Sequence, residues 1–375
     1  MKLETNKRME FYDTVLSLEW DRTGEEIYSK TASDVERALN KQNPNVEDLK
    51  ALVSPAAENY LETMAQLSQA ITQKRFGKTI QFYIPLYLSN ECVNHCIYCG
   101  FNHKNKIRRI VLSDKEIMSE IQIIKSMGFE HILLVTGESP KHVTVEYIEH
   151  VMQLIRPYFK QISIEIQPLS SEEYQRLQHS GLYGVYVYQE TYNRHRYNCY
   201  HPAGMKRNYQ WRLETPERLG KAGIHKIGLG VLLGLEDWRI ESVFLALHLR
   251  YLEKHFWKSK YSISFPRMRP HEGSFQSDFT VTDKQFAQMI FAFRLFDNDI
   301  EMSLTTREDR IFRNNMLSLG ITSMSAGSKT EPGGYSQKEA LEQFSVNDNR
   351  SPQELLEMIS QKGYDVVWKD WDSFE

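Results

Sequence analysis

From about residue 79 onward, two patterns of apolar and polar positions alternate along the chain. Short apolar runs rich in β-branched and aromatic residues end in glycine or polar residues, and each is followed by a segment whose apolar residues recur every three to four positions. The eight runs lie at 80–89, 131–138, 162–169, 184–191, 226–235, 261–269, 301–307 and 321–328. This alternation predicts an α/β fold, a closed (β/α)8 barrel of the TIM type. A six-unit open barrel is the alternative, but the last two runs are as strong as the others.

Capping signals indicate where several helices begin. A serine or threonine followed three residues later by glutamate or glutamine can satisfy two backbone amides, and a proline fits the first helical turn. Such signals stand at Ser33/Glu36, Ser54-Pro55, Ser113/Glu116, Ser170/Glu173, Thr215-Pro216, Thr282/Gln285 and Ser351-Pro352, and Gly77 ends the helix predicted after Pro55. We therefore expect a helical N-terminal extension at 1–78, the barrel at 79–330, and a short C-terminal extension at 331–375 that packs on the barrel.

The first apolar run leads into a loop that holds three of the four cysteines, Cys92, Cys96 and Cys99. Three thiolates are too many for one redox pair and too few for a closed zinc site. An iron–sulfur cube normally takes four protein ligands, so a cube held by three leaves one iron free to bind another group. The alternative is a zinc loop completed by His95 or His103.

The spacing of this loop, with Tyr98 between the second and third cysteines, resembles the motif of the radical S-adenosylmethionine (SAM) enzymes. That resemblance implies a [4Fe-4S] cluster on the three cysteines and SAM chelated to the free iron. It also implies that the barrel is a radical SAM barrel, with Tyr98 beside the cofactor.

Side chains at the C-terminal ends of barrel strands carry the chemistry of such folds. The second run ends in Gly137 and Glu138, and the resemblance implies that these two bind the amino group of SAM, with Thr136 replacing the first glycine of the family's Gly-Gly-Glu stretch. In the third run Glu165 alternates with isoleucines and would face the barrel interior. An unpaired buried carboxylate is costly, so Glu165 is interpreted as a ligand of SAM or of an arginine, or else as part of a structural ion pair.

The fourth run ends in a stretch dense in hydrogen-bonding groups, where Gln189 and Glu190 are expected to lie along SAM, as similar stretches do in related enzymes. Arg212, in the segment that follows, could reach the SAM carboxylate, although arginines on a helix are more often solvated. Between them, residues 192–209 form a polar, aromatic segment that is long for a barrel loop and suggests a lid. Its Cys199 is interpreted as incidental.

The last three runs suggest a site for an amino-acid substrate. An arginine with a nearby hydroxyl holds a carboxylate by charge-assisted hydrogen bonds, and Arg307 with Ser325 is the favoured pair. Arg267 is a further substrate-binding candidate, with an ion pair at the barrel rim as the equal alternative. No residue beyond the cluster ligands is identified as catalytic.

Seven stretches together resemble one family, the 2-iminoacetate synthases, which are the tyrosine lyases of thiamine biosynthesis. They are YIPLYLSNECVNHCIYCGF, LLVTGE, IEIQPL, VYVYQETY, FPRMRP, LTTRE and VWKDWDS, and the similarity runs nearly end to end. The family cleaves SAM reductively and breaks the Cα–Cβ bond of L-tyrosine, which gives 2-iminoacetate (dehydroglycine) and p-cresol. It implies two protein partners, a thiazole synthase and a flavodoxin or ferredoxin-type reductant.

Three other activities are weighed against this one. A tryptophan lyase of the same superfamily would share the barrel, the cluster and the carboxylate clamp. A hydrogenase maturase that cleaves tyrosine carries further cysteines near its C-terminus, and this chain has none after Cys199. A catalytically silent scaffold would close its cluster site, which three cysteines do not.

Composition excludes some classes of protein. The net charge of −3 and the 25% of charged residues give no basic excess for nucleic acid. No apolar run approaches the ~20 residues of a membrane span, and the N-terminus lacks an apolar signal core. Clustered free cysteines suit a reducing compartment, so a cytoplasmic location is expected.

Overall fold

The computed structural model describes residues 10–336 and 340–368. Eight parallel strands follow one another around a closed barrel, since β1 pairs with both β2 and β8. The strands are β1 (Thr79–Ser89), β2 (His131–Thr136), β3 (Gln161–Glu165), β4 (Gly184–Tyr186), β5 (Lys226–Gly230), β6 (Lys260–Ser264), β7 (Glu301–Leu304) and β8 (Ser323–Ser325). The predicted (β/α)8 barrel is confirmed, and the six-unit alternative is wrong.

Most strands are shorter than the apolar runs that predicted them. The second, third and fourth runs continue past β2, β3 and β4, whose last paired residues are Thr136, Glu165 and Tyr186. Beyond these points the chain turns over the barrel mouth, and its backbone leaves the ladder. Side chains such as Glu138 and Glu190 therefore lie on loops just above the strands, where the C-terminal ends of all eight strands meet.

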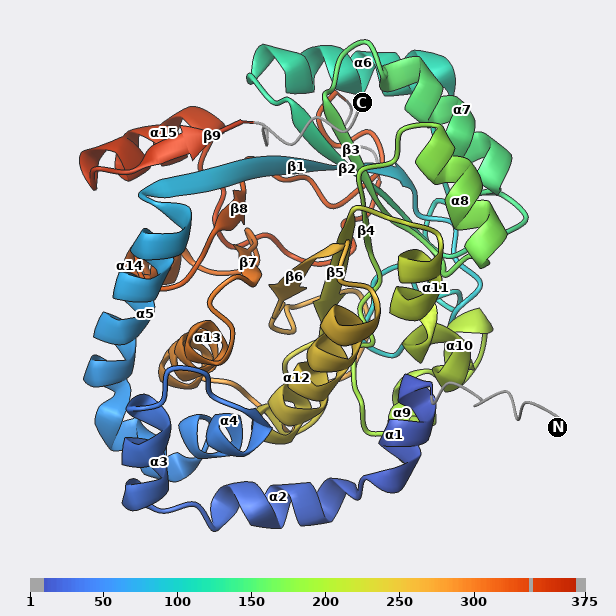
Figure 1. The fold of residues 1–375 in the computed structure, drawn as a ribbon. Coiled ribbons are helices and arrows are strands. Elements are labelled where there is room, and N and C mark those ends of the chain that lie inside the picture. Colours follow the sequence, from blue (N-terminus) through green and yellow to red (C-terminus); the bar gives the residue numbers. More distant parts are fainter. Residues whose placement is uncertain (1–9, 337–339, 369–375) are drawn as a thin grey trace, which may run out of the picture.

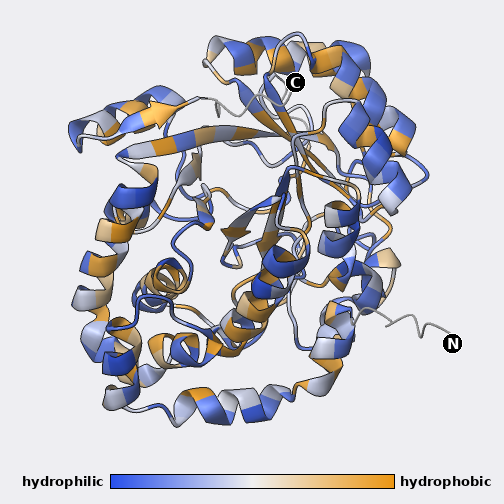
Figure 2. Ribbon diagram, in the orientation of Figure 1, coloured by the Kyte–Doolittle hydropathy of each residue, from blue (hydrophilic) through white to orange (hydrophobic). Residues whose placement is uncertain are grey.

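Helices surround the barrel (Figure 1). Their bounds are α6 (Asp114–Ser126), α7 (Val145–Ile155), α8 (Ser171–His179), α11 (Thr215–Lys221), α12 (Trp238–His255), α13 (Asp283–Phe296) and α14 (Arg310–Met316). Hydrophobic residues gather on the helix faces that meet the strands, and hydrophilic ones on the outer faces (Figure 2). The capping boxes predicted at Ser113, Ser170 and Thr282 are present. In α11 the N-cap position is Glu214 rather than Thr215, and its side chain makes no capping hydrogen bond.

Residues before the barrel are helical, as the periodicity predicts. They form α1 (Phe11–Ser17), α2 (Trp20–Tyr28), α3 (Ala32–Leu39), α4 (Val46–Leu52), the 3₁₀ helix η1 (Pro55–Tyr60) and α5 (Leu61–Phe76). They wrap the side of the barrel covered by α12 and α13 (Figure 1). Gly77 ends α5 with φ +68°, a conformation that favours glycine. The cap predicted at Ser33 is wrong, because Thr31 and Asp34 form the capping box of α3 two residues earlier.

The segment after the barrel returns to it at both ends. At the N-terminal end of the strands, β9 (Asp365–Val367) pairs with β1, a strand that the sequence pattern did not predict. The helix before it, α15 (Pro352–Gln361), begins at the predicted Ser351 cap. The VWKDWDS stretch runs mostly outside the described residues. In the described part of the chain, no helix is both long and apolar enough to cross a membrane. The three-part division of the chain stays a prediction.

Candidate active site

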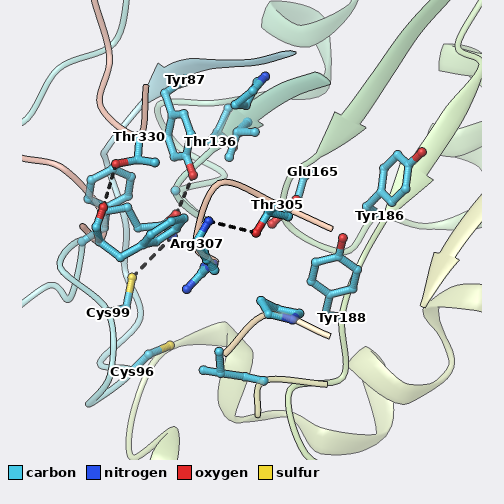
Figure 3. Close-up of a pocket in the computed structure, with 18 of the residues that line it drawn as sticks. Tyr87, Cys96, Cys99, Thr136, Glu165, Tyr186, Tyr188, Thr305, Arg307 and Thr330 are labelled. Carbon is cyan, nitrogen blue, oxygen red and sulfur yellow. Dashed lines mark hydrogen bonds between the residues drawn. The ribbon is translucent and has the colours of Figure 1, made fainter. Parts of the chain in front are cut away.

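The mouth of the barrel holds a cavity of about 170 Å³, where a single water molecule needs roughly 10–15 Å³. It lies at the C-terminal ends of the strands, where a barrel enzyme binds its substrates. Eleven of the residues expected from the sequence line it, namely Cys92, Cys96, Tyr98, Cys99, Gly137, Glu138, Glu165, Glu190, Arg212, Arg307 and Ser325. In Figure 3, Cys96 and Cys99 lie on one side of this cavity, Tyr186 and Tyr188 on the other, and Arg307 between them.

All three cysteines of the loop line the cavity, and the loop passes very close to Gly137. A Cβ atom at residue 137 would lie 2.3 Å from the carbonyl oxygen of Glu91 and 3.2 Å from the Cβ of Cys92, so only glycine fits. Burial and the nearby Glu138 carboxylate raise the pKa of Cys92 to about 11, and burial raises the pKa of Cys96 and Cys99 as well. Buried thiolates of this kind need a cation, and three sulfur ligands on one wall fit an iron–sulfur cluster.

The two histidines of this loop do not complete a zinc site. Neither lines the cavity. Their rings stack on each other with centroids 5.5 Å apart, and Nδ1 of His103 lies 3.0 Å from the carbonyl oxygen of Cys92. The structure therefore gives no support to the zinc alternative.

Glu138 is held in a buried network beside the cysteines. It accepts hydrogen bonds from Arg212 Nη1 at 2.8 Å and from Asn94 Nδ2 at 2.8 Å. Burial alone would raise the pKa of Glu138, but Arg212 and Lys206 hold it below its ordinary value. Arg212 is itself 6% exposed and donates through Nε to the carbonyl oxygen of Tyr188 at 2.6 Å. The alternative of a solvated Arg212 is thus wrong, and the side chain lines the cavity, where SAM binding was predicted for it.

Glu190 forms the second carboxylate of this network. Its Oε1 lies 2.6 Å from Lys206 Nζ and 3.6 Å from Arg212 Nη2. Among the described residues, it is the one non-glycine residue with positive φ, +70°. Such a conformation is strained and is retained where the surroundings hold it, commonly at functional sites. Here the ion pairs and a hydrogen bond from the Leu232 amide, at 2.9 Å, fix the backbone.

Glu165 and Arg307 line the same cavity as this network. Burial, reinforced by repulsion from Glu190, raises the pKa of Glu165 to about 7, although Arg307 opposes the shift. The guanidinium carbon of Arg307 lies 3.3 Å from the centroid of the Phe344 ring. In the described part of the chain no carboxylate forms an ion pair with Arg307, and burial lowers its pKa. Arg307 is therefore a half-buried cation that an anionic ligand would stabilise.

Ser325 stands near the backbone of Arg307. Its Oγ accepts a hydrogen bond from the Thr306 amide at 3.1 Å, which leaves the hydroxyl proton free to donate elsewhere. The Arg307 amide in turn donates to Thr305 Oγ1 at 3.3 Å (Figure 3). The loop after β7 is thus tied to β8, and both groups of the expected clamp lie in one cavity.

Two of the expected site residues lie outside the cavity lining. Arg267 pairs with Glu308 and with Asp283, the latter at 2.6 Å, so its contacts support the rim ion pair and contradict the role in substrate binding. Gln189 turns away from the cavity, and its buried amide has no hydrogen-bond partner among the described residues. Side chains alternate along an extended segment, so Tyr188 and Glu190 face the cavity while Gln189 does not.

The segment 192–209 covers the cysteine loop, as expected of a lid, and contains α9 (Tyr197–Tyr200) and the 3₁₀ helix η2 (Met205–Arg207). Its His201 lies 2.7 Å from the Tyr98 hydroxyl. Because burial and neighbouring cations lower the pKa of His201, the ring is neutral. Its Nδ1 donates to the Tyr197 carbonyl at 2.8 Å, so Nε2 accepts the Tyr98 proton. Cys199 is exposed and lies outside the cavity lining.

Lys206, Gln343 and Phe344 are among the cavity-lining residues that sequence reasoning missed. Gln343 Nε2 lies 3.6 Å from the Cys99 sulfur, and its Oε1 accepts from the Tyr87 hydroxyl at 2.8 Å (Figure 3). Gln343 and Phe344 come from the segment after the barrel, which no strand-end pattern marks. For Lys206, the high density of cations in 192–209 was the available signal.

Two family models match the chain. The model for the radical SAM superfamily matches residues 86–247. The model for the biotin and thiamin synthesis associated domain matches residues 264–365.

Curated relatives named 2-iminoacetate synthase match almost end to end. The one from Salmonella typhimurium is 49% identical over 366 residues, which are 97% of each chain. The one from Escherichia coli is 48% identical over the same share of each.

Among solved structures, the FeFe-hydrogenase maturase HydG from Carboxydothermus hydrogenoformans superposes with a TM-score of 0.89 at 31% identity, covering 96% of this chain and 85% of that one. Methylornithine synthase PylB, at 18% identity and a TM-score of 0.71 over 89% and 97% of the two chains, shows the shared fold. On the full-length identity, the chain belongs to the 2-iminoacetate synthase family of the radical SAM superfamily.

Proposed function

We propose that this protein is a radical SAM lyase that cleaves the Cα–Cβ bond of L-tyrosine to give 2-iminoacetate and p-cresol. SAM is converted to 5′-deoxyadenosine and methionine, and the iminoacetate serves the thiazole moiety of thiamine. The full-length identity to 2-iminoacetate synthases is the observation that carries the proposal. Three cysteines and an arginine that forms no ion pair among the described residues line the same cavity and support it.

The cofactors of this superfamily are a [4Fe-4S] cluster and SAM. Cys92, Cys96 and Cys99 would hold the cluster. When bound, cluster and SAM supply a 5′-deoxyadenosyl radical that takes a hydrogen atom from the substrate. Glu138 and Glu190 offer carboxylate oxygens to the amino group of SAM, and Arg212 between them suits its carboxylate.

Arg307 and Ser325 are proposed to bind the carboxylate of tyrosine. The guanidinium has no other anionic partner in the described residues, and the serine has a proton to donate. Stacking on Phe344 fixes the guanidinium plane, so the substrate carboxylate has one preferred direction of approach. Holding the amino acid by its carboxylate orients its amino group toward the cluster side of the cavity, which is a positioning effect.

The remaining wall of the cavity suits a phenol. Tyr186 and Tyr188 come from β4 and the segment directly after it, and with Glu165 they place two hydroxyl groups and a carboxyl group in the barrel (Figure 3). These groups can donate to and accept from the hydroxyl of the substrate. The lid segment and the segment carrying Phe344 close the cavity above, which limits access of water.

Two partners and a compartment belong to this proposal. Iminoacetate hydrolyses readily in water, so a thiazole synthase bound to this enzyme would receive it directly. A flavodoxin or ferredoxin-type protein would supply the electron. Three unpaired cluster thiols require a reducing compartment such as the cytoplasm.

The test is an anaerobic assay. The chain is reconstituted with iron and sulfide and given SAM, dithionite and L-tyrosine, and 5′-deoxyadenosine and p-cresol are measured by mass spectrometry. Both should form, Cys96→Ala should abolish both, and Cys199→Ala, a matched change outside the cavity, should leave both within about twofold. Formation of 5′-deoxyadenosine without p-cresol would move the assignment to another substrate, with tryptophan first. A loaded cluster that yields neither product would indicate a silent scaffold.

Substrate binding is tested with a second matched pair. Arg307→Met should raise the KM for tyrosine about 100-fold, because a charged hydrogen-bonding partner of the carboxylate is lost and such groups contribute about 1.5–3 kcal/mol. Arg267→Met removes an arginine of the same size at the rim and should leave KM unchanged. Equal effects of the two changes on KM would refute the proposal that Arg307 binds the carboxylate of tyrosine.

A further inference from the structure

Two loops lie together over the cluster cysteines. The cysteine loop, residues 92–109, donates through the amides of His95 and Ile97 to the carbonyl oxygens of Ala203 and Tyr200, at 3.0 and 3.1 Å. The lid segment, residues 192–209, donates back through the Lys206 amide to Asn94 Oδ1 at 2.9 Å. The outer faces of the two segments therefore form one continuous surface above Cys96 and Cys99, which we name the cluster roof.

The cluster roof is cationic, whereas the whole chain is slightly acidic. The chain carries 46 lysines and arginines against 49 carboxylates. The 36 residues of the two segments, 18 in each, contain eight lysines and arginines, four in each segment, and not one aspartate or glutamate. At the proportions of the whole chain, segments of this length would hold cations and carboxylates in nearly equal numbers. Positive charge is thus concentrated at this one face.

Part of this charge stabilises the roof itself. Arg109 donates to three backbone carbonyls of its own loop, among them Phe101 at 2.9 Å and Asn102 at 2.7 Å, and to the carbonyl of Asn90 just before it. Arg196 pairs with Glu236 at 3.0 Å. Lys206 belongs to the active-site network, and Arg108 also has a partner.

The other four cations serve no contact of this kind. Lys104, Lys106, Arg194 and Arg207 are exposed. Across residues 10–336 and 340–368, no carboxylate pairs with any of them. Two exposed glutamates lie on segments that touch the roof through their backbone. The carbonyl oxygen of Glu272 accepts from Asn105, and the carbonyl oxygen of Glu342 lies against Gly100.

An apolar spot accompanies these charges. Met205, on η2, is 43% exposed and is one of six large hydrophobic side chains exposed in the described residues. Ile97 and Ile107 of the cysteine loop are half-buried. A small apolar area with a charged surround is typical of transient protein interfaces, in which charges steer the encounter and apolar contacts hold it briefly.

We propose that the cluster roof is the docking surface for an acidic electron-carrier protein. This inference rests on the proposed function, because only a redox enzyme needs a protein donor at this place. In the step concerned, the carrier loses one electron and the cluster held by Cys92, Cys96 and Cys99 gains it. Docking on the roof places the donor on the shortest protein path to those ligands, and the four free cations complement an acidic carrier.

The experiment compares two reductants on the cluster-loaded enzyme. Reduced flavodoxin, an acidic carrier, is titrated against the wild type and against Lys104→Glu/Lys106→Glu, Arg194→Glu/Arg207→Glu and the combined fourfold variant. The initial rate of 5′-deoxyadenosine formation gives a second-order rate constant for each. Since electrostatic steering raises association rates by about 10–10³-fold, we expect at least a tenfold loss in the fourfold variant and a flattened salt dependence.

Dithionite separates this proposal from the proposed function. With this small reductant the variants should keep their 5′-deoxyadenosine and p-cresol formation within about twofold, which also shows that they fold and load the cluster. The control variant Lys160→Glu/Lys258→Glu reverses two exposed lysines just before β3 and near the start of β6, at the opposite end of the barrel. It should behave as the wild type with both reductants.

Three outcomes would overturn the proposal. One is an unchanged flavodoxin rate constant in the fourfold variant. Another is an equal loss in the control variant, which would indicate net charge rather than a surface. The third is a loss of thiazole synthase binding with normal flavodoxin kinetics, which would assign the roof to that partner. Absence of products with dithionite in the wild type would instead refute the proposed function and leave the flavodoxin comparison without meaning.

Discussion

The contact between Gly137 and the cysteine loop gives the sharpest test of the site. Replacement of Gly137 by alanine adds one methyl group that would lie 2.3 Å from the Glu91 carbonyl oxygen. Side-chain Cβ atoms essentially never approach closer than 3.0 Å, so the two backbones must separate by at least 3.0 − 2.3 = 0.7 Å. Glu91 directly precedes Cys92, the first proposed cluster ligand, and the displacement therefore reaches the cluster.

Neighbouring hydrogen bonds hold the backbones on both sides of this contact, so they cannot separate easily. The Gly137 amide donates to the Ser89 carbonyl at 2.9 Å, and the Val93 amide donates to the Glu138 carbonyl at 2.9 Å, so both sides of the contact are anchored. Overpacking at such a place costs about 1–3 kcal/mol of stability, and a misplacement near 1 Å can cost about 100-fold in rate. We expect Gly137→Ala to fold, to bind iron, and to form 5′-deoxyadenosine about 100-fold more slowly than the wild type.

The assay measures iron per chain, the electron paramagnetic resonance spectrum of the reduced cluster, and the initial rate of 5′-deoxyadenosine formation. Gly24→Ala is the matched control, because the added methyl on α2 meets only the side chain of Ile240, whose Cδ1 lies 3.0 Å away and can turn aside. The control should retain full activity. Activity of Gly137→Ala within threefold of the wild type, with an unchanged spectrum, would refute the reasoning from this contact.

Three further predictions concern stability. Arg212→Met leaves Glu138 buried without its ion-pair partner, which should lower the free energy of unfolding by about 3–5 kcal/mol and weaken SAM binding. An unchanged midpoint of chemical denaturation would contradict a stabilising role of this ion pair. Since the pKa of Glu165 is raised to about 7 in the folded state, its contribution to stability is present at low pH and is lost as pH rises through 7. Glu165→Gln should therefore make the cluster-free protein more stable at pH 8 by up to about 3 kcal/mol, but at pH 5 by no more than about 1 kcal/mol, and thermal melts at both pH values would measure this. Asp348→Ala removes the buried partner of Arg313, at 2.5 Å, and should cost about 3–5 kcal/mol; Asp299→Ala, at an exposed pair with Arg75, should cost below 1 kcal/mol.

Local signals predicted the framework of the barrel because they act over a few residues. An apolar run needs only its own side chains to indicate a buried strand, and a capping box such as Ser170/Glu173 closes within one helical turn. The errors also have local causes. Thr31 offers the same cap as Ser33 two residues earlier, and a run of apolar residues does not show where pairing stops, so the segments after β2, β3 and β4 were included in the strands.

The residues of the candidate site also divide into those that local signals predicted and those that they did not. The cysteine loop and the strand-end residues Glu138, Glu190 and Arg307 were placed at the cavity, because the spacing of cysteines and the ends of strands can be read from the sequence alone. Gln189 and Arg267 were misplaced: one residue of alternation turns the first away from the cavity, and the acidic partners of the second lie on other segments.

The sequence by itself determined the barrel, the three cluster cysteines and the family, since periodicity, spacing and motif are properties of neighbouring residues. Only the tertiary structure brought Gln343 to the sulfur of Cys99, Phe344 to the plane of Arg307, and Lys206 to Glu190. Gln343 and Phe344 reach the loops after β1 and β7 from the segment after the barrel, and Lys206 turns back to Glu190 from the lid segment. Their meeting depends on closure of the whole barrel, because no local pattern records which distant side chains will share a cavity.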